Sequence, residues 1–364
     1  MNSETIPVRI LAFYLPQYHP IPENDQWWGE GFTEWTNVKK ARPLYRGHLQ
    51  PRIPAGLGYY DLRDAEAREA QAQLAKLFGI DGFCYWHYWF GGGKTLLERP
   101  LREVLASGKP DFPFCVAWAN QSWTGKWHGL NDQIIVEQTY PGRDDDEKHF
   151  YHLLPAFEDA RYIKIRSKPL VFVYIPDQLP DPNFFTEFWN ELAVKNGFSG
   201  IYFIGVHYID WDHQKDGFDE KTIHQPFHYI HTYERKLSRR LAGIVKRRVL
   251  LGWPEVYHYR KLIEAYDFSL LSGKDFIPTL IPNWDNTPRC GRRGVVFQGS
   301  TPESFKKHLL EGVQYVLRRT AGEKMILVKS WNEWAEGNYL EPDALWGRGY
   351  LEAIREVKNT PTAI

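Results

Sequence analysis

Two glutamates three residues apart carry the clearest chemical signal in this chain. Glu333 and Glu336 lie in the stretch SWNEWAEGN at 330–338, directly after the apolar run MILVK at 325–329. If the chain turns there, side chains at positions i and i+3 face the same space. Glycosidic bonds are commonly broken between two carboxyl groups, one that protonates the leaving oxygen and one that acts as base or nucleophile. We therefore predict that Glu333 and Glu336 are a catalytic pair, with the neighbouring tryptophans raising the pKa of one of them.

Aromatic, amide and histidine side chains also gather just after other strand-like runs. Aromatic residues make up 16% of the 364 residues, and many of the 15 tryptophans stand beside glycine, asparagine, glutamate or histidine. A buried indole needs a partner for its N–H group, so tryptophans in such loops favour a cleft that stacks on sugar rings. The predicted substrate-binding residues are Tyr14, Gln17, His19, Trp86, His87, Trp89, Trp118, Asn120, Trp123, His207, Tyr208, Asn283, Trp284, Asp285, Trp331, Asn332 and Trp334.

A repeated unit must position these residues, and it consists of a β-rich run, a polar or aromatic loop and a helical pattern. Strands are predicted at 9–14, 82–86, 114–119, 170–175, 201–206, within 222–228, at 276–281 and at 325–329. Helices are predicted at 64–78, 95–106, 145–157, 183–195, 234–248, 302–319 and 342–357.

The alternation of these elements defines the fold class. Strands that alternate with helices indicate parallel pairing with crossover helices, and near-continuous apolar strands indicate burial on both faces. We therefore predict an α/β fold, a single (β/α)8 TIM barrel that takes up the whole chain, 1–364. In such barrels the active site forms at the carboxyl ends of the strands. A doubly wound sheet would require a glycine-rich turn after its first strand, whereas residues 15–20 read LPQYHP.

Composition limits the kinds of binding partner and the cellular compartment that can be expected. The formal charge is zero, because Lys and Arg number 45 and Asp and Glu also number 45, so no overall field favours nucleic acid. The N-terminus lacks a basic region followed by an apolar one, and no apolar run reaches the roughly 20 residues of a membrane span. We expect a cytoplasmic protein without a transmembrane segment. Cys84, Cys115 and Cys290 are widely spaced and odd in number, which fits free thiols.

Two short patterns raise the alternative of phosphate or nucleotide binding. The stretch GGGKT at 91–95 resembles the end of a phosphate loop, but Tyr88 stands where that pattern needs a glycine. The stretch DWD at 210–212 has the spacing of an aspartate pair that holds a metal and a nucleotide-sugar diphosphate. Such three-residue patterns are common by chance, and we predict neither a cofactor nor a metal.

Two further patterns lie between the predicted sixth and seventh strands. His224, His228 and His231 have spacings that a zinc site could use, but a proline interrupts the helix that would align the first two. The basic stretch that begins at Arg235 and ends at Arg248 could rest on an anionic membrane surface. We interpret that stretch as an outer helix of the barrel.

Four motifs resemble a known family. FYLPQYH at 13–19, WWGEGFTEW at 27–35, CYWHYWF at 84–90 and WNEWAE at 331–336 resemble the WbsX-like proteins. These belong with the family 99 glycoside hydrolases of the endo-α-mannosidase and endo-α-mannanase type. WbsX-like proteins are associated with bacterial surface-polysaccharide and lipopolysaccharide synthesis, and are often labelled glycosyltransferases. The resemblance covers about 9–352 and implies a (β/α)8 barrel that acts on α-linked glycans without a metal.

The resemblance also implies a mechanism. In family 99 hydrolysis a carboxylate deprotonates the sugar's own 2-hydroxyl, whose oxygen displaces the leaving group to give a 1,2-anhydro sugar and net retention. By position, Glu333 is implied as that base and Glu336 as the general acid. The leading hypothesis is a retaining glycoside hydrolase-like enzyme for an α-linked bacterial oligo- or polysaccharide. The alternatives are a glycosyltransferase on the same barrel and a non-catalytic glycan-binding protein.

Overall fold

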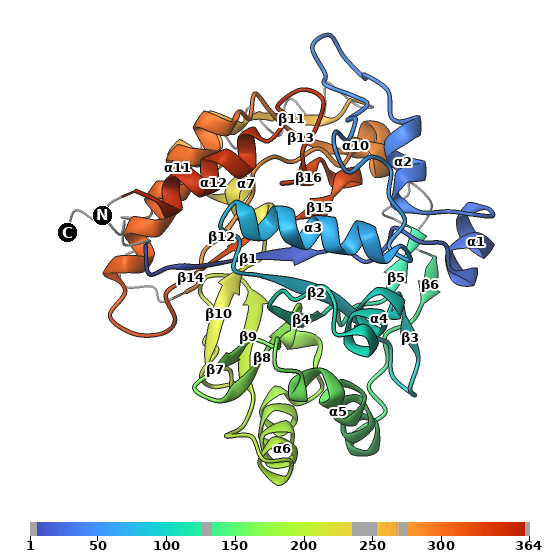
Figure 1. Cartoon of the computed structure of the whole chain (residues 1–364), viewed down its shortest axis with the longest axis vertical. Coiled ribbons are helices and arrows are strands. Elements are labelled where there is room, and N and C mark those ends of the chain that lie inside the picture. Colours follow the sequence, from blue (N-terminus) through green and yellow to red (C-terminus); the bar gives the residue numbers. More distant parts are fainter. Residues whose placement is uncertain (1–5, 126–132, 235–252, 267, 269–275, 361–364) are drawn as a thin grey trace.

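Eight parallel strands form a barrel in the computed structural model, which describes residues 6–125, 133–234, 253–266, 268 and 276–360. Neighbouring strands follow the order β10–β9–β8–β4–β2–β1–β14–β12, so the chain runs once around the barrel (Figure 1). Their bounds are β1 (Arg9–Tyr14), β2 (Gly82–Trp89), β4 (Phe114–Trp118), β8 (Lys168–Val173), β9 (Tyr202–His207), β10 (Glu220–Ile223), β12 (Thr279–Leu280) and β14 (Met325–Val328).

The barrel closes between β10 and β12 through a narrow contact. Thr222 and Ile277 form an isolated parallel bridge, and the Ile277 amide donates to the Lys221 carbonyl at 2.8 Å. The Thr222 hydroxyl donates to the Ile277 carbonyl at 2.7 Å. The (β/α)8 fold predicted from the sequence is thus confirmed.

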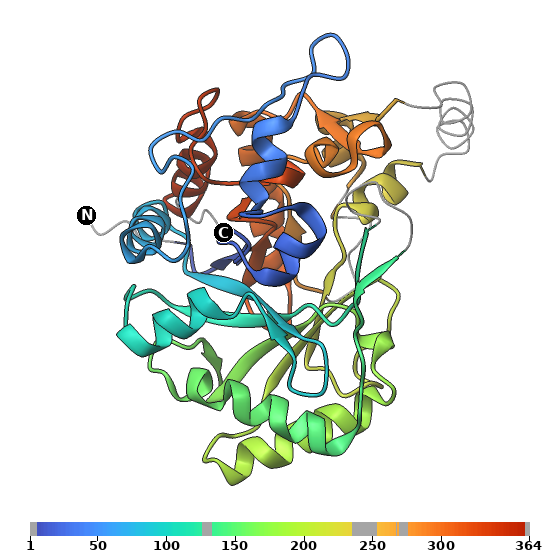
Figure 2. The ribbon, with the colours of Figure 1, turned by 90° about the vertical axis from the view of Figure 1, so that its right-hand side faces the viewer.

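Helices cover the outside of the barrel, and short elements decorate its ends (Figure 1). The helices are α1 (Pro22–Trp28), α2 (Glu34–Lys40), α3 (Ala65–Leu77), α4 (Arg99–Ser107), α5 (Arg143–Glu158), α6 (Pro182–Lys195), α7 (Phe227–Glu234), α9 (Tyr259–Ala265), α10 (Thr287–Cys290), α11 (Pro302–Arg318) and α12 (Gly349–Lys358), with the 3-10 turns η2 (Pro176–Gln178), η4 (Gly291–Arg293) and η5 (Trp334–Glu336). The remaining strands are β3 (Thr95–Leu96), β5 (Trp123–Thr124), β6 (Ile134–Val136), β7 (Lys164–Ile165), β11 (Glu255–His258), β13 (Val295–Gln298), β15 (Asn332–Glu333) and β16 (Asn338–Tyr339). Figure 2, which faces the right-hand side of Figure 1, shows α1 and α2 in blue toward the viewer.

Local chemistry explains where several helices begin. The side chains of Asp64, Asp181 and Thr301 accept backbone N–H bonds at the starts of α3, α6 and α11, whose first N–H groups have no partner within the helix. In the described part of the chain, every helix is too short or too polar to cross a bilayer.

Two strands are shorter than predicted because proline cannot donate to a sheet ladder. The strand predicted within 222–228 is β10, which ends at Ile223, ahead of Pro226. The strand predicted at 276–281 retains only the two residues of β12, which stand between Pro278 and Pro282.

The predicted helices also differ from the observed ones in three places. The helix predicted at 95–106 begins at Arg99, because β3 first pairs back onto β2. The helix predicted at 342–357 begins at Gly349. The Asp343 carboxylate accepts hydrogen bonds from the backbone N–H groups of Leu345 and Trp346 and holds a turn there. Residues 208–219 form turns instead of a crossover helix, and nearly all of the predicted helix at 234–248 lies outside the described residues.

Alternate strand residues point into the barrel and outward toward the helices. In β1, Phe13 points inward, where its ring stacks on Trp86 of β2 at 4.8 Å and packs edge-on against Phe172 of β8 at 5.8 Å. The next residue, Tyr14, points outward and donates a hydrogen bond to Gln71 on α3 at 2.7 Å. This alternation decides which aromatic side chains can reach the mouth of the barrel.

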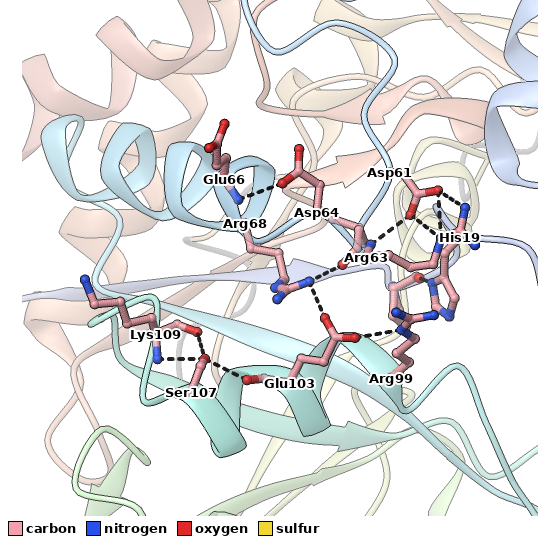
Figure 3. A network of polar contacts seen from close by, with 12 residues as sticks. His19, Asp61, Arg63, Asp64, Glu66, Arg68, Arg99, Glu103, Ser107 and Lys109 are labelled. Atoms are coloured by element: carbon pink, nitrogen blue, oxygen red, sulfur yellow. Dashed lines mark hydrogen bonds and ion pairs between the residues drawn. The ribbon is translucent and has the colours of Figure 1, made fainter.

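A polar network joins α3 to α4 on the outside of the barrel (Figure 3). Arg68 on α3 lies 2.8 Å from the Glu103 carboxylate on α4, and Arg99 holds the same carboxylate at 2.7 Å. His19 lies at the edge of this network, close to Asp61, as Figure 3 shows. These contacts fix two helices against the strands that carry the candidate site.

Candidate active site

A cavity of about 160 Å³ opens at the carboxyl ends of the strands. The residues that line it stand at or beyond the ends of β1, β2, β4, β8, β10, β12 and β14, which is where active sites of such barrels form. The lining residues are Leu15, Gln17, Asn24, Trp28, Glu34, Trp86, Tyr88, Ala119, Gln121, Ser122, Trp123, Thr124, Ile135, Tyr174, Gln225, Pro226, Phe227, Trp284, Arg289, Lys329, Glu333 and Glu336.

The two glutamates of the predicted pair come from a tight hairpin that follows β14. β15 pairs antiparallel with β16, and the turn η5 joins them. Gly337 has a φ of +57°, and a Cβ atom at this position would lie 2.8 Å from the Cβ of Asp285. Glycine alone fits this close approach. The hairpin therefore turns sharply, and Glu333 and Glu336 both face the cavity.

A buried carboxylate supports this hairpin from below. Glu341 accepts hydrogen bonds from the Tyr60 hydroxyl at 2.9 Å, the Gln71 amide at 2.7 Å and the Trp334 indole at 2.6 Å. Burial raises the pKa of Glu341 to about 7, although these donors oppose the shift. Three donors thus bond to one carboxylate at the base of the hairpin, and this network fixes the orientation of the hairpin.

Arg289 connects two carboxylates in the wall of the cavity. Its Nη1 donates to Glu336 Oε1 at 2.6 Å, and its Nε donates to Glu34 Oε2 at 3.1 Å. Burial acts to raise the pKa of Glu336, but Arg289 and Lys329 outweigh burial and hold that pKa below its usual range. Glu336 is therefore ionised in this arrangement. For Glu34, burial dominates and raises the pKa despite Arg289.

Glu333 is the protonated member of the pair. Burial raises its pKa to about 8, and the negative charge of Glu336 adds to the shift. The indole N–H of Trp86 donates to Glu333 Oε1 at 3.0 Å, which leaves the other carboxyl oxygen to carry the proton. Near neutral pH the two carboxyl groups together hold one proton, the charge state that paired acid and base catalysis requires.

Several buried polar atoms in the cavity wall have no hydrogen-bond partner among the described residues. They are the Asn24 Nδ2, both amide atoms of Gln225, the Trp284 Nε1 and the Glu336 Oε2. A buried polar group that stays unpaired costs about 1–3 kcal/mol.

The structure brings six of the predicted site residues together at this cavity. They are Gln17, Trp86, Trp123, Trp284, Glu333 and Glu336. The three tryptophan side chains and the two carboxyl groups therefore line one cavity. The catalytic and binding roles of these residues stay predictions.

Four predicted contacts lie on the outward face of their strands instead. They are Tyr14, His87, Trp89 and Trp118. Tyr14 is bonded to Gln71 on α3, and the other three pack against His149 or Asp145 on α5. The sequence placed all four at strand ends, but the two-residue period of a strand turns every second side chain toward the helices. Their expected place in the cleft is wrong.

Others among the predicted contacts hold loops in position. Asn120 exchanges hydrogen bonds with the backbone of Ile175 at 2.9 Å, and the Asn283 side chain accepts from the backbone N–H of Trp284 at 2.8 Å. The Asp285 carboxylate accepts from His48 and Gln50, both at 2.8 Å. These polar side chains form hydrogen bonds within the protein, and none of them lines the cavity.

The same is true within the hairpin motif. Asn332 exchanges hydrogen bonds with the backbone of Leu15, Trp334 is bonded to Glu341, and Trp331 is fully buried with its ring 5.1 Å from that of Phe83. The prediction that Trp331, Asn332 and Trp334 contact the substrate is therefore wrong as well.

Three predicted contacts lie elsewhere on the molecule. His19 is buried, with its Nδ1 3.0 Å from the Pro16 carbonyl. His207 Nε2 lies 3.4 Å from Asp177 on η2, and Tyr208 is 64% exposed beyond the cavity rim. None of the three lines the cavity: His19 and Tyr208 stand in the segments after β1 and β9, and His207 is the last residue of β9.

Several residues that line the cavity were assigned no role from the sequence. They include Asn24, Tyr88, Tyr174, Gln225, Arg289 and Lys329, and Glu34 was noted without a rank. Of these, Arg289 and Lys329 supply the positive charges that act on the glutamate pair. Lys329 and Tyr88 could have been found from strand periodicity, since both fall on the inward phase. Arg289 lies far in sequence from both partners, and no local pattern marks it.

The weaker sequence patterns have structural explanations. Residues 91–95 form the tight turn that joins β2 to β3. Asp212 forms an ion pair with Lys215 at 3.2 Å, and Trp211 packs over Gly205. His224 shares a 2.5 Å hydrogen bond with the Tyr174 hydroxyl. The basic stretch from 235 to 248 lies outside the described residues.

Comparisons with known proteins agree with this architecture. A family model described as Glycosyltransferase WbsX matches residues 10–354. Two curated relatives are the protein WxcX from Xanthomonas campestris pv. campestris, strains B100 and ATCC 33913. They are 36% identical over 357 and 359 residues, which cover 97% of this chain. The chain spans about half the length of these relatives.

Solved structures share the fold at low sequence identity. The GH99 endo-alpha-mannosidase from Bacteroides thetaiotaomicron in complex with bis-tris-propane has a TM-score of 0.59, is 15% identical and covers 96% of this chain and 95% of its own. A glycoside hydrolase-like protein has the same TM-score, is 16% identical and covers 98% of this chain and 95% of its own. Likeness at this identity supports the barrel fold and nothing finer.

Proposed function

We propose that this chain, which belongs to the Glycosyltransferase WbsX family, is a retaining glycoside hydrolase-like enzyme that acts on an α-linked bacterial glycan. One observation carries the proposal, which is the pair of buried carboxyl groups that shares one proton in a cavity at the barrel mouth. Carbohydrate as the ligand class is supported by Trp86, Trp123 and Trp284, which line the cavity around the pair.

The proposed reaction uses one carboxylate as a base and one protonated carboxyl group as an acid. One carboxylate removes the proton of the sugar's 2-hydroxyl while that oxygen bonds to the anomeric carbon. The bond from the anomeric carbon to the leaving oxygen breaks, and the other carboxyl group protonates the leaving oxygen. Water then opens the 1,2-anhydro ring by the reverse proton transfers, which regenerates both groups with net retention.

The protein's own charges bear on which glutamate does which step. The resemblance implies that Glu333 is the base and Glu336 the acid, whereas burial and the charge of Glu336 favour a proton on Glu333, and Arg289 and Lys329 keep Glu336 ionised. The implied roles therefore require the proton to pass from Glu333 to the adjacent Glu336 before the glycosidic bond breaks. We propose that this transfer accompanies sugar binding and that Glu336 then acts as the acid.

Leaving-group dependence tests both the activity and the roles. Glu336→Gln should abolish turnover of oligosaccharides, whose leaving oxygen needs a proton, and should largely spare activated aryl glycosides, since general acid catalysis contributes about 10²–10⁴-fold. Glu333→Gln should impair both substrates. The opposite pattern would exchange the two roles. Full activity in both variants would show that the pair is not catalytic, and glycan binding without turnover in the wild type would favour a protein that only binds glycans.

The family description favours a second candidate, a glycosyltransferase on the same barrel. A nucleotide-sugar transferase must neutralise a departing diphosphate, usually with a metal or with basic groups. Calorimetry with Mn²⁺ and uridine or guanosine diphosphate sugars separates the candidates. Micromolar binding that is lost in Asp212→Asn would support the transferase.

A further inference from the structure

A second hollow adjoins the catalytic cavity and shares two of its lining residues, Trp28 and Arg289. It lies between the end of α2 and the turn formed by α10 and η4. Trp27 and Phe32 contribute further aromatic surface to its wall. The shared residues place the second hollow next to the cavity that holds the glutamate pair.

Charge distinguishes the two hollows. Glu34, Glu333 and Glu336 line the catalytic cavity, whereas none of the described residues around the second hollow is acidic. Lys40 and Arg42 line the second hollow and are exposed. This hollow therefore presents positive charge beside a cavity that is rich in carboxyl groups.

The charges of Lys40 and Arg42 are not paired with carboxylates of the described residues. Within the described ranges, neither side chain has a carboxylate within ion-pair distance. The neighbouring Lys39, by contrast, rests over the Tyr59 ring, with Nζ 4.4 Å from the ring centroid. Lys40 also stands in the last turn of α2, where a cation complements the helix dipole. Arg42 lies beyond that helix, so the dipole does not account for it.

We propose that the second hollow is a subsite for an anionic sugar, and that the substrate is an acidic oligo- or polysaccharide. The inference rests on the proposed carbohydrate function. The aromatic side chains supply stacking faces for a sugar ring, and Lys40 and Arg42 supply donors for a carboxylate or phosphate group on that ring. The charge of Arg289 is already balanced by Glu34 and Glu336, with which it forms ion pairs, so the uncompensated positive charge of this hollow comes from Lys40 and Arg42.

Calorimetry with matched glycans tests the subsite. The probes are α-linked trisaccharides that differ at one position, which carries glucose, glucuronic acid or glucose 6-phosphate, placed at each position in turn. The protein is the Glu333→Gln variant, so that no probe is consumed. We expect one acidic isomer to bind about tenfold more tightly than its neutral counterpart at low salt, and less so as salt screens the exposed charges.

A pair of double variants locates the preference. Lys40→Ala with Arg42→Gln should remove the tenfold preference and leave the affinity for the neutral trisaccharide within twofold. Lys39→Ala with Arg46→Gln removes the same charge from the same segment but outside the second hollow, and should keep the preference. A preference for glucuronic acid over the phosphate, or the reverse, identifies the anionic group.

Two results would overturn the subsite while leaving the proposed function intact. One is equal binding of acidic and neutral probes by a protein that turns over neutral glycans. The other is an equal loss of the preference in the two double variants. If the wild type neither binds nor turns over any of the probes, the proposed function fails, and the subsite fails with it.

Discussion

Removal of the Arg289 charge should change the titration of the catalytic pair. In Arg289→Gln the side chain can still donate a hydrogen bond, but the guanidinium that lies 2.6 Å from Glu336 Oε1 is lost. A hydrogen bond to a charged group contributes about 1.5–3 kcal/mol, and one pKa unit corresponds to 1.36 kcal/mol. We therefore expect the pKa of Glu336 to rise by about 1–2 units, with a smaller rise for Glu333, whose pKa Arg289 also lowers.

Both the charge state and the activity report this change. The two carboxyl carbons can be followed by ¹³C NMR of labelled glutamate, with assignments from the Glu333→Gln and Glu336→Gln variants. In kcat/KM, the wild type should be active between the lowered pKa of Glu336 and about pH 8, where Glu333 loses its proton. In the variant, the acidic limb should move upward because Glu336 is harder to ionise.

Arg289→Lys is the matched control. Lysine keeps the charge, but its single ammonium group cannot reproduce the two separate donors that reach Glu34 and Glu336. Its acidic limb should therefore move less than that of Arg289→Gln. If Arg289→Gln folds and its Glu336 titrates as in the wild type, then Arg289 does not set the charge of the pair and the electrostatic reasoning is refuted.

Three further predictions follow from the same structure. Trp284→Ala and Trp118→Ala should each lower the free energy of unfolding by about 3–5 kcal/mol, since both side chains are buried. Only Trp284→Ala should also weaken glycan binding, about tenfold, while Trp118→Ala leaves KM unchanged; equal effects on KM would contradict the assignment of inward and outward tryptophans. The pKa of Glu341 is raised in the folded state from 4.5 to about 7, so the folded state binds this proton more tightly than the unfolded state does. Stability to urea should therefore fall as the pH rises through that window. Glu341→Gln should flatten this pH dependence, and an unchanged slope would show that another group causes it. Glycan turnover should survive a chelator such as EDTA, and a loss restored by Mn²⁺ would contradict a pair that works with carboxyl groups alone.

The sequence was sufficient for the barrel because its strands and helices carry strong local signals. Apolar runs of four to six residues, such as the one in β14, match strands buried on both faces. The Asp64 cap and the polar pattern that follows it mark α3 closely. The exception is β12, where proline on either side leaves a ladder of two residues, and where a pattern of apolar residues overstates the strand.

The charge of the site could not be predicted, since it depends on contacts between distant segments. Arg289 meets Glu336 across 47 positions and Glu34 across 255. Glu34 and Glu336 both fall within motifs that were quoted from the sequence, but the arginine that joins them stands in a short turn after β12 without any motif around it. Arg289, together with Lys329, lowers the pKa of Glu336 against the effect of burial, whereas burial raises the pKa of Glu333, so local spacing gave the pair without its charge state.

The strand period also limits what an aromatic motif can say about a ligand. In β2, Trp86 and Tyr88 face the cavity, whereas His87 and Trp89 pack against α5, although all four stand together in one motif. A side chain that must fit a helix is as constrained in type as one that must fit a sugar, so both phases of the strand look equally distinctive in the sequence. A shift of one residue in register would exchange the two sets. The aromatic motif thus predicts where the cavity lies, and the phase of each strand decides which of its residues can touch a substrate.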